Sequence, residues 1–340
     1  MDYPPFMPSN RQWILASRPK QLVTPDVLQQ AEMMVPPLSE GQALARVKYL
    51  SIDPTMRIWM ADVPQYMPPV QLGEVMRSFG LAEILESRHP DFKKGDKLMG
   101  LTGLQEYVVI TPGDPRAFQK LPSIPFLSDT NFLGTLGLNG LTAYFGLLEI
   151  AKPQSGETLV VSGAAGATGS IVGQLGKIHG CRVIGIAGSD DKCRWIKDDL
   201  AFDVAINYKH PDWRQQLIAA TPNGVDIDFE NVGGEIMEAV LDRMKLHGRV
   251  ILCGLISGYT RQDPALSSFS RVLIKRLRVE GFIILDYASR FMDAARQLGM
   301  WKMTGKIKDR HTIVKGFDRA PEAINMLFQG DNIGKLIVEL

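Results

Sequence analysis

The stretch Thr158-Leu-Val-Val-Ser-Gly-Ala-Ala-Gly-Ala-Thr-Gly-Ser170 indicates the fold of the larger part of this chain. An apolar run of strand character ends in a glycine-rich turn, and an amphipathic stretch of helix character follows. Gly166 allows the backbone to approach phosphates, Gly169 allows helix and strand to pack closely, and the helix N-terminus presents N–H groups to an anion. Ala164 stands where the first glycine of the usual G-x-G-x-x-G pattern is expected, and tight turns also use glycine for backbone reasons alone. The turn is therefore a candidate pyrophosphate site that the rest of the chain has to support.

Length and charge narrow the class of protein. The chain has 340 residues, which is too many for one compact core and predicts two domains. Its net charge of +1 gives no electrostatic reason to expect nucleic acid, an anionic membrane surface or an acidic partner. No apolar run approaches the roughly eighteen residues of a membrane span, and the first residues lack the pattern of a signal peptide. We therefore expect a cytoplasmic protein.

The metal-binding residue types are dispersed along the chain. Three cysteines and five histidines show none of the close spacings of a zinc site. Cys181 and Cys253 stand beside apolar strand residues and are interpreted as buried small hydrophobes. We therefore expect no bound metal.

From Thr158 onward, segments of strand and helix character alternate with short connections. The predicted strands are Thr158–Ser162, Arg182–Ala187, Val204–Asn207, Val225–Phe229, Arg249–Cys253 and Arg278–Leu285, and the clearest predicted helices are Gly234–Lys245 and Ser267–Arg276. Most of these strands are almost continuously apolar, as in a parallel sheet that helices cover on both faces. The alternation predicts an α/β fold of the Rossmann type, a doubly wound parallel sheet.

The first 130 residues lack this alternation and predict a mostly β domain with irregular loops. Its predicted strands are Ala43–Ser51, Leu81–Glu86, Asp96–Leu101 and Glu106–Ile110. After Met303 come a short strand, a helix over Ala320–Phe328 and a last strand over Lys335–Leu340. Because this tail lies outside the six-strand pattern, we expect it to return to the first domain.

The residues just past the second predicted strand of the sheet indicate which dinucleotide is bound. An NAD site uses a carboxylate at this point for the ribose hydroxyls, whereas the chain has Gly188 and Ser189, with Lys192 three residues on. Small residues and a cation suit a 2′-phosphate, so NADP(H) is the favoured cofactor. Ser189 also reads as a helix cap, and the carboxylates of Asp190 and Asp191 count against a phosphate there.

Two further loops follow predicted strands at the carboxyl edge of the sheet, where ligands bind in open α/β folds. The first contains Asn231, which can donate and accept hydrogen bonds, although turn chemistry alone also explains an asparagine there. The second contains Tyr259, whose phenol could stabilise a developing enolate oxygen. A lone loop tyrosine is more often a packing residue, so both readings of Tyr259 stay open on the pattern alone.

The chain resembles the zinc-independent medium-chain dehydrogenase/reductases. The blocks that carry the resemblance are residues 164–170, 187–192, 202–208, 230–234 and 253–259, with 49–57, 140–146 and 330–335 extending it almost from end to end. More narrowly, the blocks are similar to the branch of prostaglandin reductases, alkenal double-bond reductases and curcumin reductase. Several blocks matched in order are far more specific than any one of them.

The resemblance implies a division into two domains. Residues 1–133 and 315–340 would form a GroES-like, mostly β catalytic domain that holds the substrate. Residues 134–314 would form the Rossmann NADP-binding domain. Relatives commonly pair through the edge strand of that domain, so the resemblance also implies a homodimer formed around Arg278–Leu285.

The resemblance also implies the residues that hold NADP(H). The turn Ala165–Gly169 would cradle the pyrophosphate, Lys192 and Tyr208 would hold the 2′-phosphate, and the other residues would surround the nicotinamide half or the domain junction. The full set is Thr142, Ala165, Gly166, Ala167, Thr168, Gly169, Ser189, Lys192, Tyr208, Asn231, Cys253, Ser257, Tyr259, Phe282, Ile283, Ile284 and Asn332.

The implied reaction is reduction of the carbon–carbon double bond of an α,β-unsaturated ketone or aldehyde by NADPH. Hydride would reach the β-carbon, and Tyr259 would hydrogen-bond the carbonyl oxygen as the enolate forms. Thr55 stands where the family usually has a tyrosine facing the substrate, and Phe79 is bulkier than the residue usual at its place, so we expect Thr55, Phe79 and Tyr259 to shape the substrate pocket. Two alternatives remain: an NADPH quinone reductase, and a non-catalytic NADPH-binding sensor or structural protein.

Overall fold

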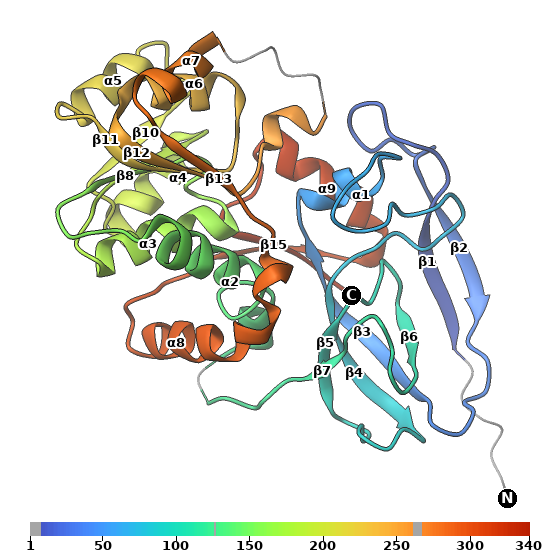
Figure 1. Cartoon of the computed structure of the whole chain (residues 1–340). Helices are drawn as coiled ribbons and strands as arrows, with labels where there is room; N and C mark the ends of the chain where they lie inside the picture. The colour runs from blue at the N-terminus through green and yellow to red at the C-terminus, as the bar shows by residue number, and fades with distance from the viewer. Residues whose placement is uncertain (1–7, 126, 261–266) are drawn as a thin grey trace, which may run out of the picture. The chain divides into compact units, whose positions relative to one another are not determined.

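The computed structural model of the chain describes residues 8–125, 127–260 and 267–340 (Figure 1). By its contacts the chain divides into two compact units. Unit 1 contains the described residues up to Leu133 together with Thr312–Asp331 and Leu336–Leu340. Unit 2 contains the described residues of Gly134–His311 together with Asn332–Lys335.

Unit 2 is built on a parallel sheet of six strands. The strands are β8 (Thr158–Val161), β9 (Arg182–Ala187), β10 (Val204–Asn207), β11 (Val225–Glu230), β12 (Met244–Leu252) and β13 (Arg278–Gly281), in the order β10-β9-β8-β11-β12-β13. The order reverses between β8 and β11, so the crevice where doubly wound sheets bind ligands lies at the carboxyl ends of these two strands. The predicted α/β class with a doubly wound sheet is confirmed.

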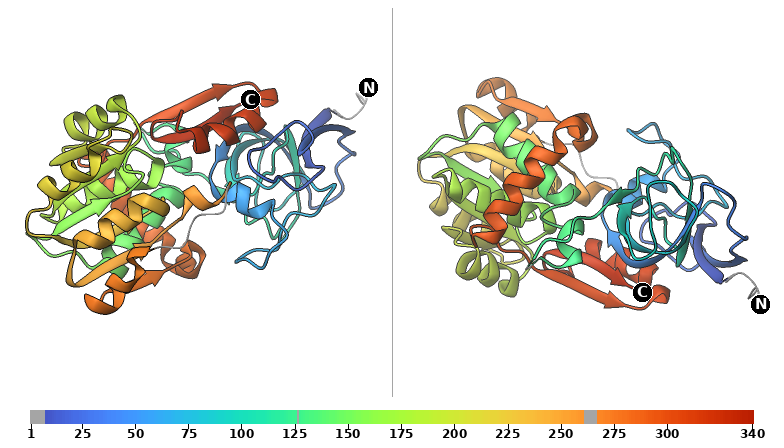
Figure 2. Two further views of the ribbon diagram at one scale, coloured as in Figure 1. Left: turned by 90° about the horizontal axis from the view of Figure 1, so that it is seen from above. Right: turned by 90° about the horizontal axis from the view of Figure 1, so that it is seen from below.

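Helices cover both faces of this sheet (Figure 1 and Figure 2). One face carries α5 (Trp213–Ala220), α6 (Gly234–Arg243) and α7 (Ser270–Ile274), and the other carries α2 (Leu138–Tyr144), α3 (Ala167–Ile178) and α8 (Phe291–Met303). Shorter helical pieces are α4 (Asp190–Arg194), η2 (Phe145–Ala151), η3 (Trp195–Asp199), η4 (Ile256–Gly258), η5 (Ser267–Phe269) and η6 (Ile284–Arg290). Val160, Ile184 and Val250 are fully buried beneath α5 and α6, which explains why these strand positions are apolar.

Several predicted boundaries in unit 2 are wrong, including the start of the strand expected over Arg249–Cys253, which begins at Met244. The strand expected over Arg278–Leu285 ends at Gly281, because its partner β12 ends at Leu252, directly opposite, and the chain then turns into η6. The helix expected over Gly234–Lys245 ends at Arg243, because Met244 already pairs with Val225 in the sheet. The helix expected over Ser267–Arg276 is two short pieces, η5 and α7, and the left-handed backbone of Arg276 (φ 48°) stops it.

Unit 1 is mostly β. Its strands are β1 (Ser9–Leu15), β2 (Leu28–Met34), β3 (Ala43–Ile52), β4 (Gly80–Ser87), β5 (Lys97–Gly100), β6 (Tyr107–Ile110), β7 (Gln119–Lys120), β14 (His311–Lys315) and β15 (Lys335–Glu339), with the short helices α1 (Thr55–Trp59), η1 (Asp129–Leu133), η7 (Phe317–Arg319) and α9 (Ala320–Gln329). β1 and β2 form a hairpin-like pair, and the other strands form a sheet in the order β14-β15-β3-β4-β5-β7, with β6 also on β3. The last strand, β15, lies antiparallel to β3, with Leu336 opposite Ile52.

None of the helices in the described parts of the chain combines the length and the apolar character needed to cross a membrane.

Candidate functional site

The glycine-rich turn leads from β8 into α3. Gly163 has a left-handed backbone (φ 57°), which allows a sharp turn of the chain between β8 and α3. Gly166 is the N-cap residue of α3, with an extended backbone and no side chain to cap the helix. A Cβ on Gly169 would lie 2.4 Å from the carbonyl oxygen of Gly163, so only glycine allows the helix to pack this closely on the turn.

The start of α3 has the donors that an anion needs. Ser170 makes the first helical hydrogen bond, from its N–H to the carbonyl oxygen of Gly166 at 3.1 Å. The N–H groups of Ala167, Thr168 and Gly169 precede it and therefore have no acceptor within the helix. Together with the positive end of the helix dipole, they fit the pyrophosphate of a dinucleotide.

The segment Asn332–Lys335 of unit 2 lies along this turn. Gly334 donates its N–H to the carbonyl oxygen of Ala165 at 2.8 Å, and Gly334 also bridges Gly166 in parallel. A Cβ on Gly334 would lie 1.9 Å from the carbonyl oxygen of Arg310, so this crossing requires glycine. The buried side chain of Asn332 donates to the Gly334 carbonyl at 3.0 Å. The structure thus places Asn332, predicted from the far end of the sequence, beside the predicted turn.

The residues predicted to hold the 2′-phosphate meet at the carboxyl ends of β9 and β10. The Ser189 hydroxyl accepts the N–H of Lys192 at 3.3 Å, which confirms that Ser189 caps α4. Tyr208 donates its N–H to the carbonyl oxygen of Ala187 at 3.1 Å. A Cβ on Gly188 would lie 3.2 Å from the Tyr208 phenol oxygen, so this ring lies against the Gly188 backbone. Lys192, in α4 after β9, and Tyr208, directly after β10, therefore both lie at the carboxyl edge of the sheet, which we call the corner of the site.

The two carboxylates that counted against a phosphate in this corner both have partners. Asp190 accepts the side-chain amide of Asn207 at 2.8 Å and lies 3.1 Å from the Nε2 atom of His210. The Asn207 hydrogen bond lowers the pKa of Asp190 below its usual value. Asp191 forms an ion pair with Arg194. Arg194 thus compensates the charge of Asp191, whereas Asp190 stays an anion that is hydrogen-bonded to Asn207.

The loops after β11 and β12 are joined by hydrogen bonds between their backbones. Cys253 donates its N–H to the Glu230 carbonyl oxygen at 2.9 Å, and Ser257 donates to the Val232 carbonyl oxygen at 2.9 Å. The Asn231 side chain donates from Nδ2 to the carbonyl oxygen of Ser162 at 2.7 Å. The predicted residues of the nicotinamide half thus lie on loops that are joined to the turn after β8.

The Tyr259 hydroxyl turns back onto its own loop. Its oxygen accepts the N–H of Leu255 at 3.2 Å. A phenol carries an O–H donor, which is the kind of group that an enolate oxygen requires. The catalytic role of Tyr259 stays a prediction.

The remaining predicted cofactor residues of unit 2 lie on α2 and on the segment after β13. Thr142 is in α2, which packs against α3, and Asn139 of α2 donates to the Thr168 hydroxyl at 3.4 Å. A Cβ on Gly146 would lie 2.7 Å from Phe282, so Phe282 packs on the helical segment η2. Ile283 has an extended backbone and Ile284 begins η6.

In unit 1, the structure gives Thr55 a partner that the sequence analysis missed. Thr55 opens α1, and its hydroxyl is hydrogen-bonded to the phenol of Tyr66. The Tyr66 oxygen also accepts the Trp59 indole N–H at 3.1 Å, and 42% of Tyr66 is exposed. Phe79 is half-buried against the core of unit 1. Although residue 55 is a threonine, Tyr66 therefore provides a phenol next to it.

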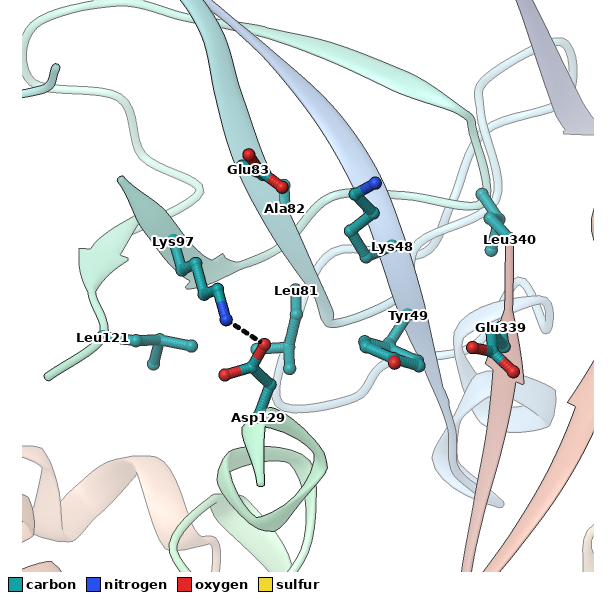
Figure 3. A pocket seen from close by; sticks show the side chains of 10 residues that line it. All are labelled: Lys48, Tyr49, Leu81, Ala82, Glu83, Lys97, Leu121, Asp129, Glu339 and Leu340. Carbon is teal, nitrogen blue, oxygen red and sulfur yellow. Dashed lines mark hydrogen bonds and ion pairs between the residues drawn. The ribbon is translucent and has the colours of Figure 1, made fainter. Parts of the chain in front are cut away.

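Unit 1 also has a hollow of about 270 Å³ on its sheet (Figure 3). Its lining residues are Lys48, Tyr49, Leu81, Ala82, Glu83, Lys97, Leu121, Asp129, Glu339 and Leu340. Figure 3 shows Lys97 and Asp129 facing each other, and their ion pair is 2.6 Å long. The lining includes none of the predicted site residues, so this hollow is not the candidate site.

Comparisons with known proteins agree with this geometry. A family model described as the N-terminal domain of oxidoreductase matches residues 11–118, and one described as zinc-binding dehydrogenase matches residues 167–299. The NADPH-dependent curcumin reductase of Escherichia coli (strain K12) is 41% identical over 340 residues, with 97% of each chain covered. The NADP(+)-dependent 2-alkenal reductase of Nicotiana tabacum is 38% identical over 308 residues, covering 89% of this chain and 88% of the relative.

A solved structure extends the agreement to three dimensions. CurA from Vibrio vulnificus in complex with NADPH is 40% identical and has a TM-score of 0.90, covering 97% of this chain and 98% of that one. The chain belongs to the zinc-independent medium-chain dehydrogenase/reductases. The resemblance of the sequence to this family is thereby confirmed.

Membership of the zinc-independent medium-chain dehydrogenase/reductases also bears on metal binding, because one matching family model is named for zinc. In residues 8–125, 127–260 and 267–340, no group of three or more His, Cys, Asp or Glu side chains is placed to hold a metal ion. The described residues therefore do not fit a zinc site.

Sequence reasoning also missed two residues that hold the loops of the candidate site. The Glu230 carboxylate accepts the hydroxyl of Ser162 across neighbouring strands, and both residues are fully buried. The available signal was a carboxylate as the last residue of a strand, directly before the predicted Asn231.

Proposed function

We propose that this chain is an NADPH-dependent reductase of the carbon–carbon double bond of α,β-unsaturated ketones and aldehydes. The observation that carries the proposal is that one unit contains the anion-binding turn, the corner with Lys192 and the loop with Tyr259. Relatives named for reducing curcumin and 2-alkenals match at least 89% of the chain, which supports the same chemistry here.

The chain's residues fit NADPH in three places. The N–H groups of the turn Ala165–Gly169 would bind the pyrophosphate, and Lys192 with Tyr208 would bind the 2′-phosphate. The loops with Asn231 and Tyr259 would hold the nicotinamide half, together with Thr142, Cys253, Ser257, Phe282, Ile283, Ile284 and Asn332. When bound, NADPH supplies the hydride that reaches the β-carbon of the substrate.

The protein contributes orientation and electrostatic stabilisation. Tyr259 donates its hydroxyl proton in a hydrogen bond to the carbonyl oxygen as negative charge gathers there. Thr55 and Phe79 contribute to the walls of the substrate pocket, and Tyr66 joins them through its hydrogen bond to Thr55.

A Tyr259→Phe variant tests the catalytic assignment. Loss of one hydrogen bond to the charged oxygen should lower kcat for an enone by about tenfold to a hundredfold and leave the Kd for NADPH unchanged. Stopped-flow kinetics and fluorescence titration of NADPH separate the two quantities. Unchanged turnover with an enone would remove Tyr259 from the mechanism.

The function itself is tested by NADPH absorbance decay with a small panel of acceptors. The panel consists of a medium-chain 2-alkenal, an aryl enone such as curcumin and a simple quinone, each with NADPH and with NADH. Fast decay with the enal and the enone, and with NADPH only, is the expected result. Decay with the quinone alone would identify a quinone reductase, and tight NADPH binding without any decay would identify a sensor or structural protein.

We further place the enzyme in the cytoplasm as a homodimer. β13 ends the order of the sheet, and its outer edge pairs with no other described strand of unit 2. An open strand edge is a natural place for a second copy to pair. Sedimentation equilibrium of the wild-type protein and of a Val279→Pro variant, which removes one backbone N–H of β13, tests the dimer.

A further inference from the structure

Two carboxyl groups are buried at the carboxyl end of β11. Asp228 and Glu230 are both fully buried, and their spacing puts them on the same face of the strand. In the sheet register Asp228 lies between Val160 of β8 and Val250 of β12, so its neighbours along the sheet are apolar. Ionisable groups in such surroundings are costly and call for an explanation.

One oxygen of Glu230 collects donors from two different loops. Its Oε1 atom accepts the Ser162 hydroxyl, from the turn after β8, and the N–H groups of Val232 and Gly233, from the loop after β11. The Gly233 bond is 2.9 Å long. The Oε2 atom of Glu230 and both oxygens of Asp228 have no hydrogen-bond partner in the described parts of the chain.

Ser162 completes the connection between the two loops. While it donates to Glu230, its hydroxyl oxygen accepts the N–H of Asn231 at 2.7 Å. Its carbonyl oxygen accepts the Asn231 side chain at 2.7 Å. The pyrophosphate turn and the loop that contains Asn231 are therefore joined by a small buried network whose charged member is Glu230.

The hydrogen bonds decide where the negative charge of the pair resides. Burial raises the pKa of both carboxyls, but three donors stabilise an anion on Glu230, whereas no described donor reaches Asp228. Burial and the neighbouring carboxylate raise the pKa of Asp228 well above its usual value, so Asp228 takes the first proton of the pair. Burial and the Glu230 charge also raise the pKa of the Cys253 thiol, the titratable neighbour from the loop after β12, to about 12.

We infer that Glu230 is a positioning residue which, as an anion bonded to Ser162 and to the loop after β11, fixes the two halves of the nucleotide site relative to each other before NADPH arrives. The inference rests on the proposed function, because it assumes that NADPH binds across these two loops. A site that is ordered in advance binds more tightly, since less conformational freedom is lost on binding.

The test measures NADPH binding to the full chain. Glu230→Gln keeps an acceptor oxygen but removes the charge, and Ser162→Ala removes the hydroxyl. Each variant should raise the Kd for NADPH about tenfold, as expected for the loss of a hydrogen bond to a charged group. The Kd of the double variant for NADPH should be about equal to that of the single variant that binds NADPH more weakly, because both changes break the same connection.

Asp226→Asn is the matched control. Asp226 lies on the same strand at the opposite edge of the sheet, where it accepts the Thr158 N–H at 2.8 Å and the Lys245 ammonium at 2.7 Å. Its loss should lower the melting temperature and leave the Kd for NADPH unchanged. This control separates a loss of stability from a loss of positioning.

Hydrogen exchange of the unliganded protein gives a readout that does not depend on the cofactor. Glu230→Gln and Ser162→Ala should each speed exchange in residues 162–169 and 231–234 together, and Asp226→Asn should not. Unchanged Kd and unchanged exchange in Ser162→Ala would overturn the inference, even if Glu230→Gln failed to fold. Absence of NADPH binding by the wild-type chain would instead overturn the proposed function.

Discussion

The two units hold their candidate site residues in different ways. In unit 2, the glycine-rich turn after β8 is built from backbone atoms at close approach, with Gly169 against Gly163 and Gly334 against Arg310. In unit 1, Thr55 is at the start of a short helix, and its described contact is a hydroxyl–hydroxyl bond to the half-exposed Tyr66.

This difference has a consequence for how each region tolerates substitution. A backbone contact that excludes even a methyl group allows little change, whereas a side-chain hydroxyl can be exchanged without disturbing the strands beneath it. We therefore expect cofactor binding to be sensitive to small changes in unit 2, and substrate preference to respond to changes in unit 1.

The largest expected effect is that of Gly169→Ala. The new Cβ would lie 2.4 Å from a backbone oxygen, so the turn must shift, at a cost of about 1–3 kcal/mol of unfolding free energy. We expect the Kd for NADPH to rise at least a hundredfold, measured by fluorescence titration. Gly299→Ala in α8 is the control, because its Cβ would come no closer than 3.7 Å to Leu136. This variant should bind NADPH with the wild-type Kd. Normal binding by Gly169→Ala would show that the turn is more adaptable than its contacts indicate.

A smaller effect in unit 2 is expected from Lys192→Ala. Loss of a charged donor to the 2′-phosphate should raise the Kd for NADPH about tenfold to a hundredfold and leave the Kd for NADH unchanged. The ratio of the two constants, from parallel titrations, is the measurement. Lys197→Ala, an exposed lysine in the neighbouring segment η3, should leave the ratio unchanged. An equal loss of affinity for both nucleotides would place Lys192 away from the 2′-phosphate.

The sequence reveals the sheet of unit 2 well because burial on both faces makes its strands apolar. The bounds of β9 and β10 agree with the prediction residue for residue. The strands β1 and β2 were not predicted, because Ser9–Leu15 and Leu28–Met34 mix polar and apolar residues and are largely half-buried or exposed. The start of β12 at Met244 depends on a sheet partner, which no local pattern contains.

In the candidate site, too, the features with a local sequence signal could be predicted, and those that depend on contacts between distant residues could not. A glycine pattern marks the turn, and Ser189 with Lys192 marks the corner, since both signals are local in the chain. The bond from Ser162 to Glu230 joins residues 68 positions apart and becomes visible only when β8 and β11 are known to be neighbours. Tyr66 meets Thr55 through a loop whose course the sequence does not indicate.

In unit 1, Thr55→Val should change substrate preference and leave the cofactor alone. The substitution keeps the shape of the side chain but removes the hydroxyl bonded to Tyr66, which retains the Trp59 indole. We expect kcat/KM to change by about threefold to tenfold, and by different factors for a short 2-alkenal and a bulky aryl enone. The Kd for NADPH should not change. Thr111→Val, at an exposed threonine of unit 1, is the control and should leave kcat/KM unchanged. A changed Kd for NADPH in Thr55→Val would contradict the expectation that unit 1 affects substrate preference and not cofactor binding.

The smallest effect on stability near pH 4 is expected from Asp228→Asn, which there replaces a protonated carboxyl with a neutral group of similar shape. Because the pKa of Asp228 is higher in the folded protein than in the unfolded chain, the folded state holds the extra proton. The free energy of unfolding of the wild type should therefore fall as the pH rises from about 4 toward the folded pKa, by up to about 1.4 kcal/mol per pH unit. Asp228→Asn lacks this proton and should gain stability relative to the wild type as the pH rises, which urea unfolding at several pH values measures. A stability difference that stays constant with pH would show that Asp228 is not the proton carrier.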